Sequence, residues 1–200
     1  MGDFRYIIIS GTPGTGKTTL ARRLGDRLGA EVISLNELVM EKGLVEGYDE
    51  DRDTYIADFD HLVPRVVELI KDTEKAGMKR IIIEGHFADI IPEEYIDVVF
   101  LLRCHPDELK RRLEARGYGK EKVRENVEAE ILGECIQYML EKALDVPILE
   151  IDTSNMEVEA LIELILEILE GKRDYREHEL GTIDWLGLID EEGRLSEFFQ

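Results

Sequence analysis

The chain has 200 residues, of which 44% are hydrophobic, and this is enough for one well-formed core and too little for two comfortable domains. Its formal charge of −20 argues against general binding to nucleic acids or anionic membranes, because the summed field repels polyanions. Such a field favours a basic protein as partner, although plain solvation of helix faces explains the charge equally well.

The composition also indicates the environment of the protein. There are 29 Glu and 16 Asp but only five Asn and Gln together, a bias that resembles hyperthermophile composition. Cys104 and Cys135 are too few and too separated for a disulfide framework or a metal cluster, so we expect reduced, buried thiols. No signal peptide is recognised, and Glu163 and Glu167 interrupt the apolar run at 161–169, so we expect a cytoplasmic protein.

Strand and helix patterns alternate along the chain. Short apolar runs predict buried strands at 6–9, 32–33, 80–83, 98–102 and 148–151. Amphipathic patterns predict helices at 17–28, 59–76, 106–116, 120–144 and 156–169. This alternation predicts an α/β fold in which helices cover both faces of a parallel sheet, with ligands at the carboxyl ends of the strands.

The first strand leads directly into the sequence GTPGTGKTT at 11–19, a complete phosphate-binding loop motif between a strand and a helix. Glycines let the backbone N–H groups surround phosphate oxygens, and the helix N-terminus points at the same anion. Lys17 is expected to reach the β- and γ-phosphates, and the Thr18 hydroxyl suits a Mg²⁺ ligand. The motif therefore predicts binding of a nucleoside triphosphate; a Gly-rich turn with an incidental lysine is the weaker alternative.

The third strand ends in Glu84 and, two residues later, His86. A carboxylate at this point faces the phosphate loop and is expected to hold Mg²⁺, directly or through water. The His86 side chain is placed to orient a water molecule or contact a γ-phosphate. A structural histidine that is hydrogen-bonded to the backbone fits the same spacing.

Arginines follow the fourth strand. Arg112 and Arg116 lie one turn apart on the helix at 106–116, a spacing at which like charges repel unless an anion bridges them. Phosphate is one such anion, and pairing with a neighbouring carboxylate is the alternative. Arg116 precedes a glycine-rich turn and is the stronger candidate, while Arg103 closes the fourth strand near the same edge.

Two stretches depart from the alternation. The connection at 43–60 is long and dense in carboxylates, and connections of that kind are usually functional covers or mobile. The segment from 171 to the end carries aromatic residues near its end, which favour packing back on the domain over service as a partner peptide.

The phosphate loop GTPGTGKTT, the segment GYDEDRDTYIADFD, the motif EGH and the segment LLRCHPDELKRRLEARGY together resemble the adenylate kinase isoenzyme 6 family, from about 4 to 169. With this composition, the resemblance indicates an archaeal, thermophilic member. It implies one three-layer P-loop NTPase domain of adenylate kinase type over 1–170, with a five-stranded parallel sheet in the order 2-3-1-4-5. It also implies a short insert for the nucleoside monophosphate at about 34–57, a very short lid at about 115–125 and a C-terminal extension at 171–200.

The resemblance implies an adenylate kinase-like phosphotransferase that converts ATP and AMP to two ADP with Mg²⁺, with accompanying ATPase activity. Family roles map onto residues for catalysis (Lys17, His86, Glu84, Arg116), nucleotide binding (Gly14, Gly16, Lys17, Thr18, Thr19, Arg116) and metal binding (Thr18, Glu84). The backbone at 153–155 is expected to edge the adenine.

The chain departs from the family pattern at two positions. Glu84 stands where other members have Asp, and Met40 stands where typical adenylate kinases have the arginine that holds the AMP phosphate, with Lys42 nearby. Two alternatives therefore stay open. One is an ATPase that acts in small-subunit ribosome assembly and rRNA processing by binding a basic ribosomal protein, and the other is a kinase for another small acceptor.

Overall fold

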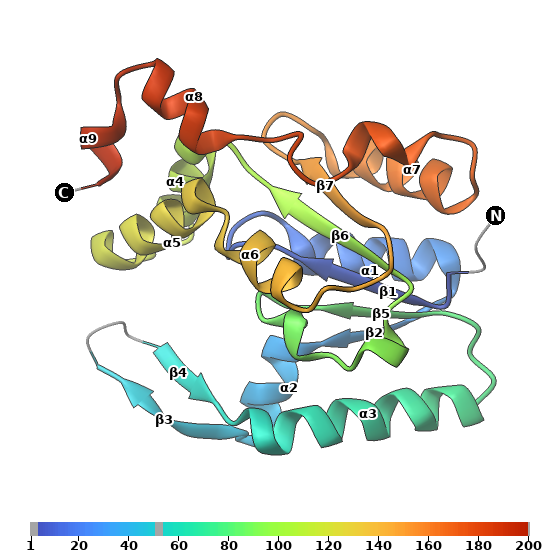
Figure 1. Ribbon diagram of the computed structural model, residues 1–200. Coiled ribbons are helices and arrows are strands. Elements are labelled where there is room, and N and C mark those ends of the chain that lie inside the picture. The colour runs from blue at the N-terminus through green and yellow to red at the C-terminus, as the bar shows by residue number, and fades with distance from the viewer. Residues whose placement is uncertain (1–3, 51–53, 200) are drawn as a thin grey trace.

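A computed structural model describes residues 4–50 and 54–199 (Figure 1). The strands are β1 Tyr6–Ser10, β2 Glu31–Ser34, β3 Val45–Asp49, β4 Thr54–Ala57, β5 Ile81–Glu84, β6 Val98–Arg103 and β7 Ile148–Asp152. The α-helices are α1 Lys17–Leu28, α2 Leu35–Lys42, α3 Phe59–Lys75, α4 Pro106–Ala115, α5 Lys120–Leu132, α6 Glu134–Glu141, α7 Val158–Leu169, α8 Trp185–Glu191 and α9 Leu195–Phe198. Short 3₁₀ turns lie at Ala88–Ile90, Glu93–Tyr95 and Tyr175–His178.

Five strands form one parallel sheet in the order β2-β5-β1-β6-β7. Numbered within the sheet, this is the expected order 2-3-1-4-5, and the prediction of an α/β fold with a five-stranded parallel sheet is confirmed. The order reverses between β5 and β6 on either side of β1, so the loop that follows β1 lies at the switch point where α/β sheets bind ligands.

Alternate residues of each strand enter two apolar layers. Ile7, Ile9 and Phe100 pack with α1 and α7, whereas Ile8 and Val99 pack with α3 on the opposite face. All five side chains are fully buried, as expected for a parallel sheet that is covered on both faces. The sheet is therefore a rigid base for the loops at its carboxyl edge.

The insert after β2 is regular where we expected a long loop. Helix α2 comes first, and β3 then pairs with β4 in an antiparallel hairpin. Figure 1 shows this hairpin and the α4–α5 pair at the end of the molecule toward which the sheet strands point. The tip of the connection, 51–53, lies outside the described residues.

The single helix expected over 120–144 is wrong, because the chain breaks at Gly133. This residue has φ 67°, ends α5 and begins α6. The left-handed conformation is inexpensive for glycine, and it redirects α6 toward the apolar layer that contains Met139. The break brings residues that follow Gly133 toward the phosphate loop.

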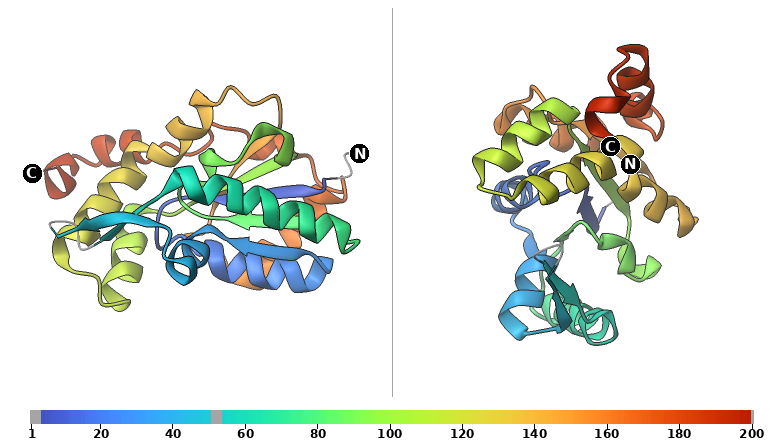
Figure 2. Two further views of the ribbon diagram at one scale, coloured as in Figure 1. Left: turned by 90° about the horizontal axis from the view of Figure 1, so that it is seen from below. Right: turned by 90° about the vertical axis from the view of Figure 1, so that its left-hand side faces the viewer.

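The C-terminal segment packs against α4 and α5 in a third apolar cluster, which includes Ile189 and Phe198. The right-hand view of Figure 2 shows it on the opposite side of the sheet from the insert. Within the described residues, no helix is long and apolar enough to cross a membrane.

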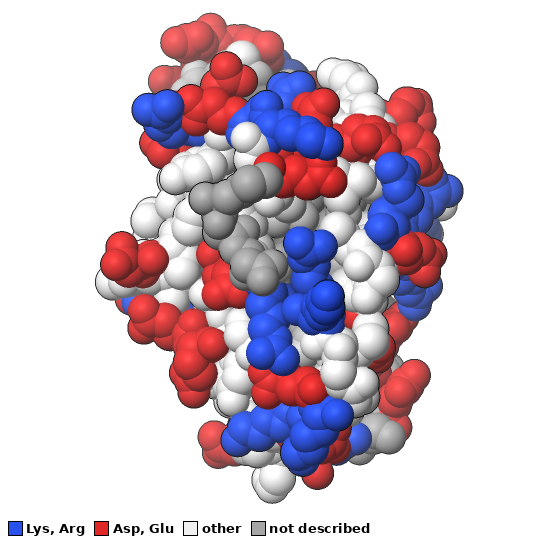
Figure 3. Space-filling view, turned by 90° about the vertical axis from the view of Figure 1, so that its right-hand side faces the viewer, with Lys and Arg blue, Asp and Glu red and all other residues white. Residues whose placement is uncertain are grey.

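Charged side chains of both signs cover the surface. On the face shown in Figure 3, basic and acidic groups are interspersed, and a group of basic side chains lies near the middle. Several arginines form ion pairs with carboxylates of other elements, including Arg23 with Glu159 and Arg27 with Glu163 between α1 and α7. The acidic groups on this face therefore do not form one continuous patch, although the chain as a whole keeps its net charge of −20.

Candidate active site at the phosphate loop

The loop between β1 and α1 forms one wall of a pocket of about 150 Å³. Its glycines have positive φ angles, 138° at Gly11, 99° at Gly14 and 104° at Gly16, which allow the backbone to fold around an anion. The pocket is lined by Pro13, Gly14, Gly16, Lys17, Thr18, Thr19, Asn36, Arg116 and Tyr118. The sequence-predicted phosphate-loop residues therefore share one cavity with Arg116.

Gly11 is required by packing as well as by conformation. A Cβ at this position would overlap the carbonyl group of Leu102, whereas a Cβ at Gly119 would meet nothing within 4 Å. We expect Gly11→Ala to lower the free energy of unfolding by about 3 kcal/mol or more, since backbone overlap adds to the strain of the positive φ. Chemical denaturation checks this result, with Gly119→Ala as a control that should stay within about 1 kcal/mol of wild type. Equal losses in the two variants would contradict the packing argument.

Lys17 lies inside the loop, with only 6% of its surface exposed. Its Nζ donates to the carbonyl oxygen of Thr12 at 3.1 Å. Burial lowers the pKa of Lys17, while nearby groups that include Glu84 and Glu130 oppose the shift. The ammonium is therefore held by the loop that is expected to bind phosphate, and it has little contact with water.

The Thr18 hydroxyl donates to Oε1 of Glu84 at 3.1 Å, and the Ser34 hydroxyl donates to the same oxygen. The second oxygen, Oε2, is buried and has no hydrogen-bond partner among the described residues. No cluster of three or more His, Cys, Asp or Glu in the described part of the chain forms a metal cage. One hydroxyl and one carboxylate beside a phosphate loop are what a largely hydrated Mg²⁺ requires, so these donors fit that cation.

His86 keeps part of its surface accessible to solvent while its ring packs beside Phe87, with ring centroids 4.5 Å apart. Its ring has no hydrogen-bond partner in the part of the chain that the structure describes, so the alternative of a backbone-bonded structural histidine has no support. The surrounding protein and the Lys17 charge together lower the pKa of His86 to about 4. The ring is thus neutral at physiological pH and able to accept a proton.

Sequence analysis missed Cys135 and Asn36 as residues of this region. Gly133 redirects the chain so that the Cys135 thiol lies 3.8 Å from the carbonyl oxygen of His86. Burial raises the pKa of Cys135 to about 11, so the thiol remains protonated at neutral pH. Asn36, in the first turn of α2, lines the pocket. The available signal for it was a polar residue shortly after the second strand.

The three arginines of the fourth strand and following helix have different environments. Arg116 ends α4 and lines the pocket. Arg112 donates to Glu108 at 2.8 Å and to the carbonyl oxygen of Thr153 at 2.7 Å, so the alternative of pairing with a carboxylate describes it better than phosphate binding. Arg103 ends β6 near the ligand edge as expected, but it is 2% exposed and bound by two carboxylates, so it is not available to a phosphate.

The segment at 153–155 lies against the phosphate loop. The Thr153 hydroxyl is 3.0 Å from the carbonyl oxygen of Thr15 and 2.9 Å from that of Arg103. Arg112 holds the same segment from the other side through the Thr153 carbonyl. The backbone that we expect to lie beside the adenine ring is therefore fixed next to the loop that we expect to bind phosphate.

Comparison with known proteins places the chain in a family. Residues 7–133 match the sequence profile of a family that is described as an AAA domain. The chain belongs to this AAA-domain family. Relatives of the AAA-domain chain include a Methanocaldococcus jannaschii protein named "Putative adenylate kinase", which is 40% identical over 179 residues with 90% of this chain and 92% of the relative aligned. A Methanosarcina acetivorans protein of the same name is 38% identical over 191 residues, with 90% and 97% aligned.

Solved structures share the fold at low identity. Shikimate kinase from Acinetobacter baumannii, in complex with shikimate, has a TM-score of 0.57 and 15% identity. The alignment covers 85% of this chain and 95% of the shikimate kinase chain. Deoxyadenosine kinase from M. mycoides, with bound dATP, has a TM-score of 0.51 and 17% identity, with 82% and 99% covered. At these identities the likenesses show the fold alone.

Proposed function

We propose that the chain is an adenylate kinase-like phosphotransferase that transfers the γ-phosphate of ATP to AMP. The observation that carries this proposal is the pocket in which the phosphate loop, Lys17 and Arg116 face the same space. Relatives named for adenylate kinase, aligned over about nine-tenths of both chains, support the same reaction.

Transfer to AMP needs no strong general base, because the acceptor phosphate already carries an anionic oxygen. The enzyme must align the two nucleotides, neutralise the transferring group and exclude water. Lys17 and Arg116, which both line the pocket, would supply positive charge. The fixed segment at 153–155 would orient the base.

Mg²⁺ fits the oxygen donors beside the loop. The Thr18 hydroxyl would hold the cation directly, and the free oxygen of Glu84 would hold it through a water molecule. Bound there, Mg²⁺ supplies neutralisation of phosphate charge and fixes the phosphate conformation. Thr18 and Glu84 would also keep their own hydrogen bond aligned for this role.

A coupled assay of ADP formation, with and without AMP, tests the proposal. We expect AMP to raise ADP formation by about tenfold or more, because a positioned anionic acceptor replaces water. Met40 occupies the position of the usual AMP-holding arginine and is exposed on α2, so AMP affinity is expected to be low and the assay must extend to high AMP concentrations. ADP formation that does not respond to AMP at any concentration would refute the kinase assignment.

We expect His86→Ala to depress ATP hydrolysis more than phosphate transfer to AMP. Hydrolysis requires a water molecule to be oriented and relieved of a proton, and the neutral His86 ring is available for this task. Because its pKa is about 4, hydrolysis should change little from about pH 8 to about pH 5 and fall as the pH approaches 4 and the ring becomes protonated. Steady-state rates of both reactions against pH, in wild type and variant, give the measurement. Equal loss of the two activities would contradict the division of roles.

A second candidate is an ATPase whose main role is to bind and release a basic protein, such as a small-subunit ribosomal protein during rRNA processing. The favouring observations are the charge of −20 and the exposed aromatic side chains of the insert, where Tyr48 and Tyr55 form an edge-on pair. Tight binding to such a protein, together with ATP hydrolysis that ignores AMP, would place this candidate first. Stimulation by a different metabolite would instead indicate a kinase for another small acceptor.

A further inference from the structure

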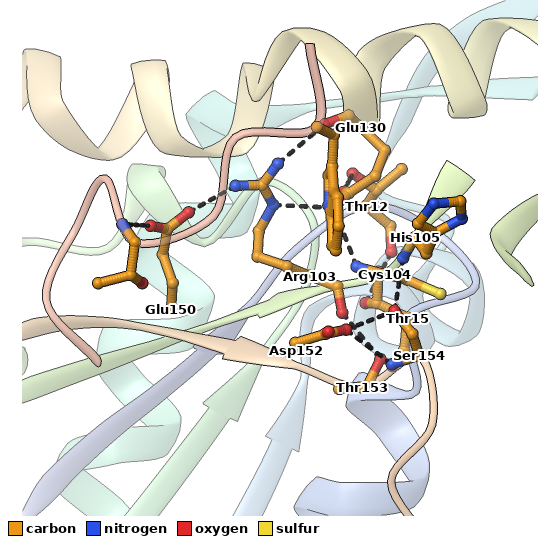
Figure 4. A network of polar contacts seen from close by, with 12 residues as sticks. Thr12, Thr15, Arg103, Cys104, His105, Glu130, Glu150, Asp152, Thr153 and Ser154 are labelled. Carbon is orange, nitrogen blue, oxygen red and sulfur yellow. Dashed lines mark hydrogen bonds and ion pairs between the residues drawn. The ribbon is translucent and has the colours of Figure 1, made fainter. Parts of the chain in front are cut away.

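A cluster of buried charges lies between the phosphate loop and the C-terminal segment (Figure 4). Arg103 ends β6, Glu130 comes from α5 and Glu150 from β7, and the exposed fraction of each side chain is at most 3%. The guanidinium donates from Nε to Glu130 at 2.8 Å, from Nη1 to Glu150, and from Nη2 to the Glu130 carbonyl oxygen at 3.0 Å. We call these three residues the Arg103 cluster.

Glu130 is the member that joins distant segments. Its Oε1 accepts hydrogen bonds from Arg103, from the Cys104 backbone N–H at 3.0 Å and from Nε1 of Trp185 at 3.1 Å. Its Oε2 accepts from the Thr12 hydroxyl. One carboxylate thus connects an indole of the C-terminal segment to the phosphate loop.

The Thr12 residue continues the connection to Lys17. Its carbonyl oxygen accepts from Lys17 Nζ at 3.1 Å and from the Thr15 hydroxyl at 2.9 Å. The side chain of Thr12 is thus held by Glu130, and its carbonyl oxygen holds the Lys17 ammonium. The bonds run without interruption from Trp185 through Glu130 and Thr12 to Lys17.

Trp185 also contacts His105, which is hydrogen-bonded to the segment on the adenine side. Its ring lies edge-on to His105, with centroids 5.3 Å apart. The His105 backbone N–H donates to Ser154 Oγ at 2.7 Å, in the segment that follows β7. The indole does not line the pocket, but it is linked through Glu130 to the phosphate loop and through His105 to the segment at 153–155.

Other contacts hold the C-terminal segment independently of Trp185. The backbone N–H groups of Gly181 and Thr182 donate to Glu150 Oε2 at 2.7 and 3.1 Å. Arg194 forms paired hydrogen bonds with Asp107 of α4 at 2.8 and 3.0 Å. Loss of the indole N–H alone therefore leaves the segment several anchors.

We propose that Glu130 is a positioning residue through which the docked C-terminal segment sets the geometry of Lys17 and the affinity of the phosphate loop for a nucleoside triphosphate. The inference rests on the proposed function only in that the loop binds a triphosphate. Glu130 acts through Thr12 and does not itself reach the pocket.

Direct binding of a non-hydrolysable ATP analogue, AMP-PNP with Mg²⁺, measured by calorimetry on the full chain, tests this inference. Trp185→Phe removes the indole N–H and keeps an aromatic ring, and Thr12→Val removes the hydroxyl and keeps the side-chain shape. Each should weaken binding about three- to tenfold, since each deletes a hydrogen bond to a buried carboxylate. Both changes interrupt one connection, so their effects should not multiply. The dissociation constant of the double variant should be within about twofold of that of the single variant with the lower affinity.

Arg194→Ala is the matched control, because it removes an anchor of the C-terminal segment that does not contact Glu130. Its affinity should stay within about twofold of wild type, as expected for an exposed ion pair. The inference would be overturned if Trp185→Phe bound the analogue with wild-type affinity, or if the two effects multiplied in the double variant. It would also be overturned if Arg194→Ala lost as much affinity as Trp185→Phe.

Trp185 is the one tryptophan of the chain, so its fluorescence gives a second readout in the native protein. Binding of the analogue should change the emission of wild type and change it much less in Thr12→Val, even if Trp185→Phe does not fold. An emission that ignores the analogue in wild type would contradict the connection. These experiments measure binding of the ATP analogue and not phosphate transfer. A failure to transfer phosphate to AMP would therefore refute the proposed kinase activity and leave the test of Glu130 unaffected.

Discussion

Replacing Lys17 with methionine is expected to lower the rate of ADP formation on the order of 10³-fold, because a preorganised cation in a water-poor site stabilises the charge of the transferring phosphoryl group. Methionine keeps the length of the side chain and removes only the charge and the hydrogen bond to Thr12. Both kcat and the affinity for MgATP should fall, since in the proposed mechanism the ammonium would contact the triphosphate before and during transfer. Steady-state kinetics at saturating AMP give the measurement.

Lys17→Met should be at least as stable as wild type. Burial lowers the pKa of Lys17, so the folded protein bears a cost for keeping this charge in the loop, and methionine removes that cost. Lys75→Met is the matched control, because Lys75 is exposed on α3 and pairs with Asp72. If Lys17→Met retained ADP formation within about tenfold of wild type, the loop would not be the catalytic site.

Much of the fold could be predicted from the sequence because the signals are local. The apolar runs of the sheet, such as Ile7–Ile9 of β1, are short and β-branched and are followed by turn residues, as is typical of buried strands. The glycines of the phosphate loop can adopt the positive φ angles that its turn requires. Gly14 and Lys17 lie in the loop that follows β1, where the topology of a parallel sheet predicts ligand binding. Arg116, at the end of α4, meets them in one pocket.

Other features depend on contacts between distant segments. The break at Gly133 lies within an otherwise helical pattern, and only the packing of α6 on the sheet shows that the chain turns there. Arg103 stands at a strand end, as a ligand-binding residue would, but its partners are 27 and 47 residues away in sequence. The helical pattern of α5 gave no reason to expect that Glu130 would be buried and would form an ion pair with Arg103.

The Arg103 cluster should also carry a large share of the stability of the fold. Arg103→Met is expected to lower the free energy of unfolding at neutral pH by about 3–5 kcal/mol, because Glu130 and Glu150 are left buried without a counter-charge. Urea denaturation checks this value. Arg27→Met is the control: Arg27 pairs with Glu163 on the surface, with about half of each side chain exposed, and its loss should cost within about 1 kcal/mol.

Equal losses in Arg103→Met and Arg27→Met would contradict this expectation. A buried ion pair that loses its cation leaves its carboxylates without solvent, whereas a surface pair does not.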